Sequence, residues 1–163
     1  GAGRVHAERA PAARAASGVA RRAEFGEGGN AVGDGGTTPL MLAAHKGEED
    51  EVRGFAEAGA DINAQDNYGW TALRYAVRGG NMEAAIALIE SGADVDLASN
   101  TGRTPLMSAA GNGLTDVLKM LVKSGADTEL KNKLGETAFD ISMRGGETGC
   151  KECQKLLSKA MNI

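Results

Sequence analysis

Apolar residues recur along the chain in short groups at positions i, i+3 and i+4, which lie on one face of a helix. The four groups are Leu40, Ala43 and Ala44; Leu73, Ala76 and Val77; Leu106, Ala109 and Ala110; and Phe139, Ser142 and Met143, the last with a serine in place. A second apolar set follows each of the first three groups: Val52, Phe55 and Ala56; Ala85, Leu88 and Ile89; and Val117, Leu118, Leu121 and Val122. The pattern predicts pairs of short helices that each bury one face.

Threonine and glycine mark the ends of these predicted helices. Threonine is a good N-cap, and proline suits the next position because its missing N–H has no partner there. Glycine tolerates the left-handed conformation that ends helices. Threonine precedes the first helix of each pair at Thr38, Thr71, Thr104 and Thr137, and glycine ends it at Gly47, Gly80, Gly113 and Gly146. The second helix ends at Gly59, Gly92 and Gly125.

One polar segment occurs three times with a period of 33 residues. GADINAQDNYGWTAL from Gly59 returns as GADVDLASNTGRTPL from Gly92 and as GADTELKNKLGETAF from Gly125. The run up to the next Gly-x-Thr is too short and too rich in Asn, Asp and Gly for a helix. A period of this length is typical of repeat architectures. We therefore expect each copy to form a projecting turn, extended on either side, that connects stacked helix pairs.

Composition agrees with a packed helical protein. The chain has 163 residues, of which 42% are hydrophobic and 25% charged, with a formal net charge of −4. Aromatic residues make up only 4%, whereas glycine alone contributes 24 residues, so small side chains must build the core. No apolar run approaches the about 18 residues that a membrane span needs, and no secretory signal is present. These features predict a cytoplasmic or nuclear protein, and the absence of an initial methionine suggests a fragment or a processed product.

The period and the recurring Thr-Pro-Leu, double alanine, Gly and Gly-Ala-Asp elements resemble the ankyrin repeat family over residues 37–163. The resemblance implies an all-α ankyrin-repeat solenoid of stacked antiparallel helix pairs, with projecting β-hairpin turns and a concave groove beside them. The repeats would span 37–69, 70–102, 103–135 and 136–163. The family usually has histidine after Thr-Pro-Leu, hydrogen-bonded to the threonine; here the position holds Met41, Arg74, Met107 and Asp140.

The two ends are less regular than the repeats. Residues 1–36 are rich in Ala, Arg and Gly, and three interpretations stay open: a degenerate capping repeat, a disordered tail and a transit-like presequence. The segment from Lys151 to the end continues the last copy through Leu156 and Leu157, with Lys151, Lys155 and Lys159 on a polar face. A terminal repeat needs such a face to stay in solution. We expect a C-terminal cap.

Candidate chemistry is sparse. Cys150 and Cys153 form a C-x-x-C, which can be a redox pair or half a zinc site; because no second pair exists, we favour two small thiols packed on one helix face. His6 and His45 are the only histidines, and neither neighbours a nucleophile and an acid. The sequence therefore predicts no enzyme, no metal site and no cofactor. Asn63 resembles the ankyrin asparagine that cellular hydroxylases modify.

The resemblance assigns partner contacts to the hairpin tips and to the end of the first helix of each repeat. The candidate partner-binding residues at these positions are His45, Lys46, Asn67, Tyr68, Trp70, Arg78, Thr101, Arg103, Asn112, Lys133 and Arg144. The same positions also hold Asp34, Gly35, Thr37, Gly79, Asn100, Gly111, Leu134, Glu136 and Gly145. Five basic residues face two acids here, on a segment that has 13 basic and 18 acidic residues over 37–163.

These positions predict a non-catalytic scaffold, a monomer, that binds a protein or peptide with an acidic, partly apolar surface. Tyr68 and Trp70 would anchor the partner, since both residue types are common among interface hot spots, and Arg78 and Arg103 would steer it. The alternative is a regulatory or targeting segment of a larger enzyme or channel. Net charge and the few arginines disfavour nucleic acid, and no membrane insertion is expected.

Overall fold

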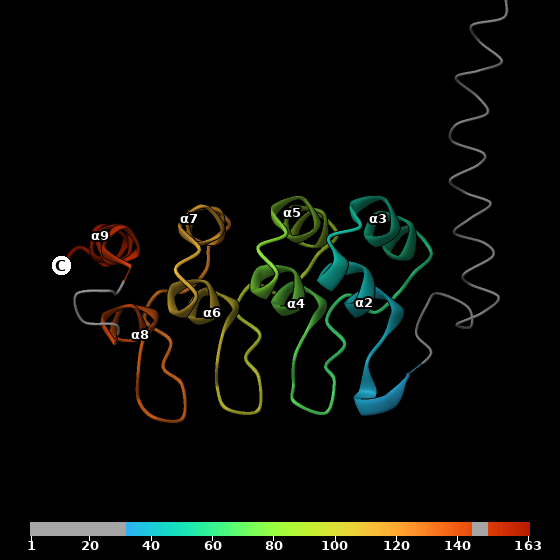
Figure 1. Ribbon diagram of the computed structural model, residues 1–163, viewed down its shortest axis with the longest axis horizontal. Coiled ribbons are helices and arrows are strands. Elements are labelled where there is room, and N and C mark those ends of the chain that lie inside the picture. The colour runs from blue at the N-terminus through green and yellow to red at the C-terminus, as the bar shows by residue number, and fades with distance from the viewer. Residues whose placement is uncertain (1–31, 145–149) are drawn as a thin grey trace, which may run out of the picture.

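The structure, a computed structural model, describes residues 32–144 and 150–163. Its helices form two rows, with α2, α4, α6 and α8 in one row, α3, α5, α7 and α9 in the other, and the loops projecting beyond the first row (Figure 1). The elements are η2 (Asp34–Gly36), α2 (Pro39–Lys46), α3 (Glu49–Glu57), α4 (Ala72–Arg78), α5 (Met82–Glu90), α6 (Pro105–Gly111), α7 (Thr115–Lys123), α8 (Ala138–Met143) and α9 (Lys151–Met161). The predicted all-α solenoid of stacked helix pairs is confirmed. The states proposed for residues 1–31 lie outside the described residues.

Each first-row helix begins at the predicted threonine. The hydroxyl oxygens of Thr38, Thr71 and Thr104 each accept a hydrogen bond from the backbone N–H three residues on, at 3.3, 3.2 and 3.3 Å, and Thr137 does the same. These bonds satisfy an amide that the helix itself cannot pair. The glycines predicted to end the helices have positive φ throughout the described part; Gly146 lies outside it. Local sequence signals therefore fix where the helices start and stop.

The core lies between the two rows and is built from small residues. The predicted first-row groups up to Ala110 are all buried, as are Val52, Leu88, Leu118 and Leu121 in the second row. In the last group Ser142 is buried and Phe139 packs partly buried against the core, but the prediction is wrong for Met143, which is 50% exposed, whereas Ile141 is buried. The residues that correspond to Met143 in earlier copies are covered by the next helix pair, and no described helix follows α8 on that side. Ala56, Ile89 and Val122 are only partly buried.

The loops are tight turns joined to one another by backbone hydrogen bonds. Residues 32–144 and 150–163 contain no β-strand, so the expected β-hairpins are not shown. Within each loop one bond closes the turn, for example from Asp66 N to Trp70 O at 3.0 Å. Between loops, N–H groups of Asn67, Asn100 and Lys133 donate to carbonyl oxygens of the preceding loop at 2.8, 3.0 and 3.1 Å. This ladder fixes the spacing of successive repeats.

In three of the four repeats, the side chain at the expected histidine position accepts a hydrogen bond from the capping threonine. The sulfurs of Met41 and Met107 accept the backbone N–H of the capping threonine at 3.4 and 3.5 Å. Asp140 accepts both the N–H and the hydroxyl of Thr137, and these two bonds lower the pKa of Asp140. Arg74 makes no such bond and extends to the next repeat instead. It is the one departure from the family pattern that does not support its own helix.

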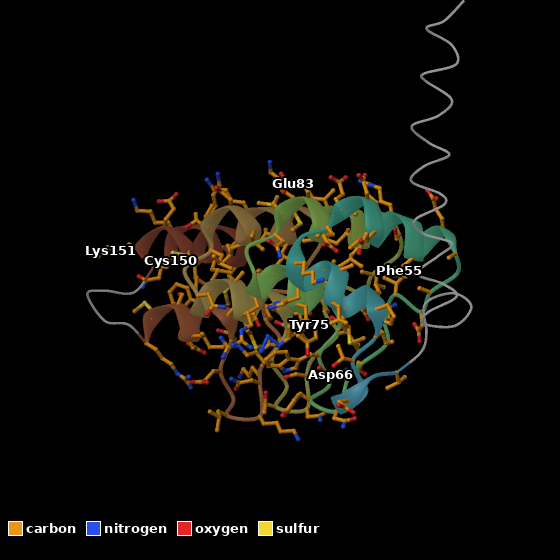
Figure 2. All side chains as sticks on the ribbon, turned by 45° about the vertical axis from the view of Figure 1, so that its right-hand side comes forward. Phe55, Asp66, Tyr75, Glu83, Cys150 and Lys151 are labelled. Atoms are coloured by element: carbon orange, nitrogen blue, oxygen red, sulfur yellow. A yellow bond between two sulfur atoms is a disulfide. The ribbon has the colours of Figure 1, made fainter. Side chains whose placement is uncertain are left out.

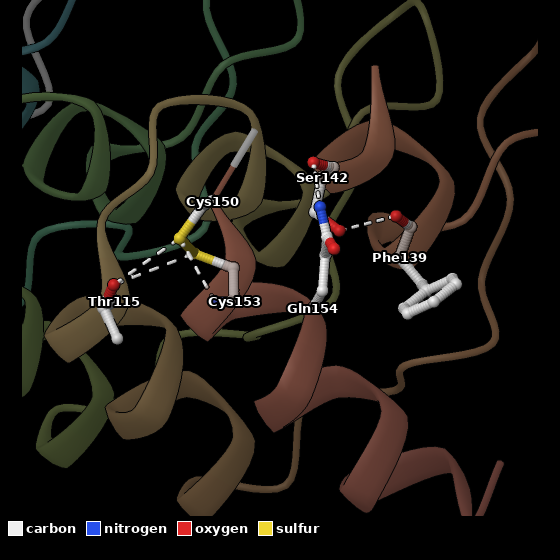
Figure 3. Close-up of a disulfide and its surroundings, with 6 residues drawn as sticks. All are labelled: Thr115, Phe139, Ser142, Cys150, Cys153 and Gln154. Carbon is white, nitrogen blue, oxygen red and sulfur yellow. Dashed lines mark hydrogen bonds between the residues drawn. A yellow bond between two sulfur atoms is a disulfide. The ribbon is translucent and has the colours of Figure 1, made fainter. Parts of the chain in front are cut away.

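The two cysteines form a disulfide, so the expectation of two packed free thiols is wrong (Figure 3). Cys150 is the N-cap of α9 and Cys153 lies in its first turn, which places their Cα atoms 5.2 Å apart, within disulfide range. Cys153 is fully buried, and the hydroxyl of Thr115 lies 3.6 and 3.8 Å from the two sulfurs. Gln154 binds the carbonyl oxygen of Ser142. The disulfide thus sits where α9 packs on α7 and α8.

Two glycines near the start of the stack provide a stability prediction. Gly54 lies inside α3 with helical dihedral angles, whereas Gly59, just after it, has φ of 84°; a Cβ added to either would meet no atom within 4 Å. We expect Gly54→Ala to raise the free energy of unfolding by about 0.5–1 kcal/mol, through better helix propensity. Gly59→Ala should lower it by about 1 kcal/mol, because alanine disfavours positive φ. Urea denaturation of both variants checks the opposite signs, and equal signs would contradict the assignment.

Gly54 also supports a prediction about local stability. The corresponding positions of α5 and α7 hold Ala87 and Met120, both better helix formers than glycine, so we expect α3 to be less stable than α5 and α7. We therefore expect the N-terminal side of the stack to open first, with residues 48–58 exchanging amide hydrogens faster than α5 and α7.

Candidate functional site

The residue directly before a capping threonine lies against the C-terminal end of the helix that this threonine begins. Three repeats show this contact, each with a different chemistry: Trp70 with Arg78, Arg103 with Gly111, and Glu136 with Arg144. We call the exposed side of these helix ends and the adjoining loop residues the inner face; it includes His45, Trp70, Arg78, Arg103 and Arg144. The position of this contact is thus the same in the three repeats, whereas the residue types that form it differ.

Trp70 lies at the centre of the contact in the second repeat. Its ring has the guanidinium carbon of Arg74 at 4.1 Å and that of Arg78 at 5.1 Å from its centroid, both within cation–π range. Ring centroids of Tyr75 and Tyr68 lie 5.3 and 5.8 Å from that of Trp70. Trp70 is half-buried, while Tyr68 is 67% exposed. Aromatic surface and positive charge therefore meet at one place.

The buried carboxylate of Asp66 holds Trp70 and Tyr75 in place through hydrogen bonds. Asp66 accepts the backbone N–H groups of Tyr68 and Trp70 at 2.9 and 2.8 Å and the hydroxyl of Tyr75 at 2.5 Å. Burial, followed by the bond to Asp66, raises the pKa of Tyr75 to about 12. Figure 2 shows both residues on the loop side of the first-row helices, with nitrogen-bearing side chains gathered beside Tyr75. Asp66 thus orients the indole and the phenol together.

Arg74 is a buried cation with no carboxylate on it. Only 8% of the residue is exposed; one guanidinium nitrogen donates to the hydroxyl of Ser108 at 2.9 Å, and Nε has no hydrogen-bond partner in the described residues. Burial, followed by the positive charges of Arg103 and Arg78, lowers the pKa of Arg74 to about 10. The side chain therefore keeps a charge in a place that disfavours it.

Arg103, in the third repeat, is also a partly buried cation whose pKa is lowered. Its guanidinium lies over Gly111, where a Cβ would come within 2.5 Å of a terminal nitrogen, and its Nε is buried without a partner in the described part of the chain. Burial lowers its pKa, and so does the charge of Arg144. The absence of a side chain at Gly111 makes the room for this guanidinium.

The arginines of residues 32–144 divide into two groups. Arg53 is paired with Glu49 and Glu90, whose hydrogen bonds raise its pKa, and Arg144 is paired with Glu136. Arg74, Arg78 and Arg103 have no ion pair within the described residues. Arg74 and Arg78 lie over the Trp70 ring, and Arg103 lies close enough for its charge to lower the pKa of Arg74. We call Trp70, Arg74, Tyr75, Arg78 and Arg103 the arginine–aromatic cluster. Among the arginines of residues 32–144, only those of the cluster lack an ion pair in the described part of the chain.

The structure brings some predicted site residues together and separates others. Trp70, Arg78 and Arg103 belong to the cluster, and the His45 ring lies 6.0 Å from that of Tyr75. Lys46 and Asn112 are exposed at the ends of α2 and α6. Asn67, Thr101 and Lys133 lie in the loops, where their backbones form the ladder between repeats. Arg144 lies one repeat away, paired with Glu136; Gly145 lies outside the described residues, and Asn63 is exposed.

Three residues of the site were missed by sequence reasoning: Asp66, Arg74 and Tyr75. The family pattern treats positions 74 and 75 as part of the helix rather than of the contact surface. The signal that could have found Arg74 was the departure itself, because a charged residue replaced histidine at a buried position. Asp66 carries no comparable signal, since Asp and Asn are ordinary turn residues.

Two rows of antiparallel helices, with the same loop and the same contact between loop and helix end in successive repeats, define a helical repeat protein. A sequence model of ankyrin repeats, in three copies, matches residues 17–99 and 87–163. The chain belongs to the ankyrin repeat family, whose repeats generally mediate protein–protein interaction and are typically non-catalytic. A comparison with curated proteins gives no match.

The described residues add two further findings. None of their helices is long and apolar enough to cross a bilayer. Among them, no three His, Cys, Asp or Glu side chains come together in a way that could hold a metal ion.

Proposed function

We propose that the chain is a non-catalytic, monomeric scaffold whose inner face binds a protein or peptide with an acidic, partly apolar surface. The observation that carries the proposal is the arginine–aromatic cluster: three arginines without an ion pair in the described residues, two of them over the only tryptophan of the chain and the third, Arg103, close to those two. Aromatic and arginine side chains are the types most common among interface hot spots. Trp70 and Tyr68 anchor the partner, and Arg78 and Arg103 pair with its acids.

Charge distribution supports an acidic partner. The chain as a whole carries −4, so a generally acidic protein is repelled from most of its surface. The inner face is the exception, since Lys46, Arg78 and Arg103 are accessible there. Complementary potentials of this kind speed encounter and fix orientation. A partner with carboxylates beside an apolar side chain fits the cluster, because the carboxylates pair with its arginines and the apolar side chain packs on its aromatic rings.

The test uses peptides selected from a displayed random library against the purified chain. Trp70→Ala and Arg103→Ala should each weaken the selected peptides at least tenfold, because each removes a centre of contact. Arg53→Ala is the matched control, since it removes the same charge from the outer row, and it should change the affinity less than twofold. Far-UV circular dichroism confirms that the variants stay folded. Unchanged affinity in both Trp70→Ala and Arg103→Ala would refute the proposal.

A further inference from the structure

The arginine–aromatic cluster has more positive charge than an ordinary acidic contact needs. We propose that Arg78 and Arg103 bind the phosphate of a phosphoserine or phosphothreonine side chain of the partner, with the buried charge of Arg74 beneath it, beside an apolar residue of the same partner on Trp70. The inference rests on the proposed function, because it names the ligand chemistry of the same inner face.

The charges around Trp70 favour a doubly charged anion. Three guanidinium groups have two carboxylates nearby, and both are already engaged: Asp66 by two backbone N–H groups and one hydroxyl, and Glu136 by Asn132 and Arg144. A single carboxylate from a partner would leave part of this charge uncompensated. A phosphate monoester carries about −1.5 to −2 charges and three acceptor oxygens at neutral pH.

The unused hydrogen-bond donors also match a phosphate. Within the described residues, the side chains of Arg78 and Arg103 make no hydrogen bond, and Arg74 makes one, to Ser108. Guanidinium groups bind phosphate oxygens through pairs of parallel N–H groups, which explains their frequency at phosphate sites. Arg78 is exposed and Arg103 half-buried, so these two present donors to a ligand. Arg74 is too buried to do more than contribute charge from beneath.

Burial strengthens this site. Arg74 is more than nine-tenths buried, and Arg103 lies in the space that Gly111 leaves open. Charges interact more strongly in such a place than in water. The three like charges repel one another, as the lowered pKa values of Arg74 and Arg103 show after the effect of burial. A dianion relieves that repulsion, so the arrangement is more favourable with the ligand than without it.

The experiment compares two immobilised degenerate peptide libraries that differ only at the central residue, serine in one and phosphoserine in the other. Selected peptides are then titrated against the full chain, with the fluorescence of Trp70 as the readout, since the chain has no other tryptophan. Arg78→Gln and Arg103→Gln remove single charges from accessible positions, and Arg53→Gln removes one from the outer row as the matched control. Circular dichroism confirms the fold of each variant.

We expect the phosphoserine library to be retained and its peptides to bind at least tenfold more tightly than their serine forms. Arg78→Gln and Arg103→Gln should each weaken binding at least tenfold, and Arg53→Gln less than twofold. Equal binding of serine peptides, or of peptides with two glutamates at the centre, overturns the phosphate assignment. If Trp70→Ala, which is measured by its retention on the immobilised peptides because it has no tryptophan fluorescence, then no longer binds them, the proposed function stands. Equal losses in Arg53→Gln and Arg78→Gln overturn the site. Retention of neither library removes both proposals.

Discussion

Gly69→Ala should lower the free energy of unfolding by about 3 kcal/mol, because it breaks the ladder that holds successive loops together. A Cβ at Gly69 would lie 2.6 Å from the side-chain oxygen of Asn100 and 2.7 Å from its backbone nitrogen. That nitrogen donates to the carbonyl of Tyr68, and the Asn100 amide donates to the carbonyl of Asn67. The new atom therefore displaces both bonds, in addition to the cost of alanine at a φ of 76°.

Gly135→Ala is the matched control for this prediction. Gly135 has nearly the same φ, 77°, but a Cβ there would meet no atom within 4 Å. We expect it to cost only about 1 kcal/mol, the penalty of the left-handed conformation alone. Chemical denaturation followed by circular dichroism measures both variants. Equal losses would mean that contact between the loops contributes nothing to the stack.

Arg74→Met should make the protein more stable, by about 1 kcal/mol. The substitution removes a buried charge that its arginine neighbours repel and that forms no ion pair in the described residues. Replacement of buried charges by apolar side chains is often neutral or stabilising. Methionine also stands at the corresponding positions 41 and 107, where its sulfur accepts the N–H of the capping threonine. The new side chain can do the same for Thr71.

Arg53→Met serves as the comparison for Arg74→Met. Arg53 is exposed and paired with two glutamates, so its replacement should leave stability unchanged or lower it by up to about 1 kcal/mol. Denaturation curves of both variants give the sign directly. A loss of stability in Arg74→Met would show that the arginine is retained for the fold.

Much of the fold follows from local signals in the sequence. Each capping threonine needs only its own side chain and the amide three residues on, and each helix-ending glycine needs only its own φ. The 33-residue period then requires every helix pair to pack like the one before. These are short-range rules, which explains why the helix ends and the first three apolar groups were predicted. Met143 of the last group is exposed, since no further first-row helix of the described residues follows α8.

The arginine–aromatic cluster was predicted only in part, because it depends on contacts between repeats. Trp70 and Arg103 were found since they occupy surface positions of the family pattern. Arg74 lies on the buried side of α4 and reaches the cluster only because Ser108 and Trp70 lie beside it in the folded chain. The disulfide was missed for a similar reason, since the sequence spacing of Cys150 and Cys153 fits packed thiols as well as a bond.

The most direct test of the arginine–aromatic cluster is the affinity of Arg74→Met for the selected phosphoserine peptides, measured by Trp70 fluorescence on protein whose stability has been determined. If the buried arginine is kept for ligand binding, affinity falls at least tenfold while the free energy of unfolding stays at or above that of the original chain. Unchanged affinity in a folded Arg74→Met protein would contradict the assignment of this cluster as the binding site.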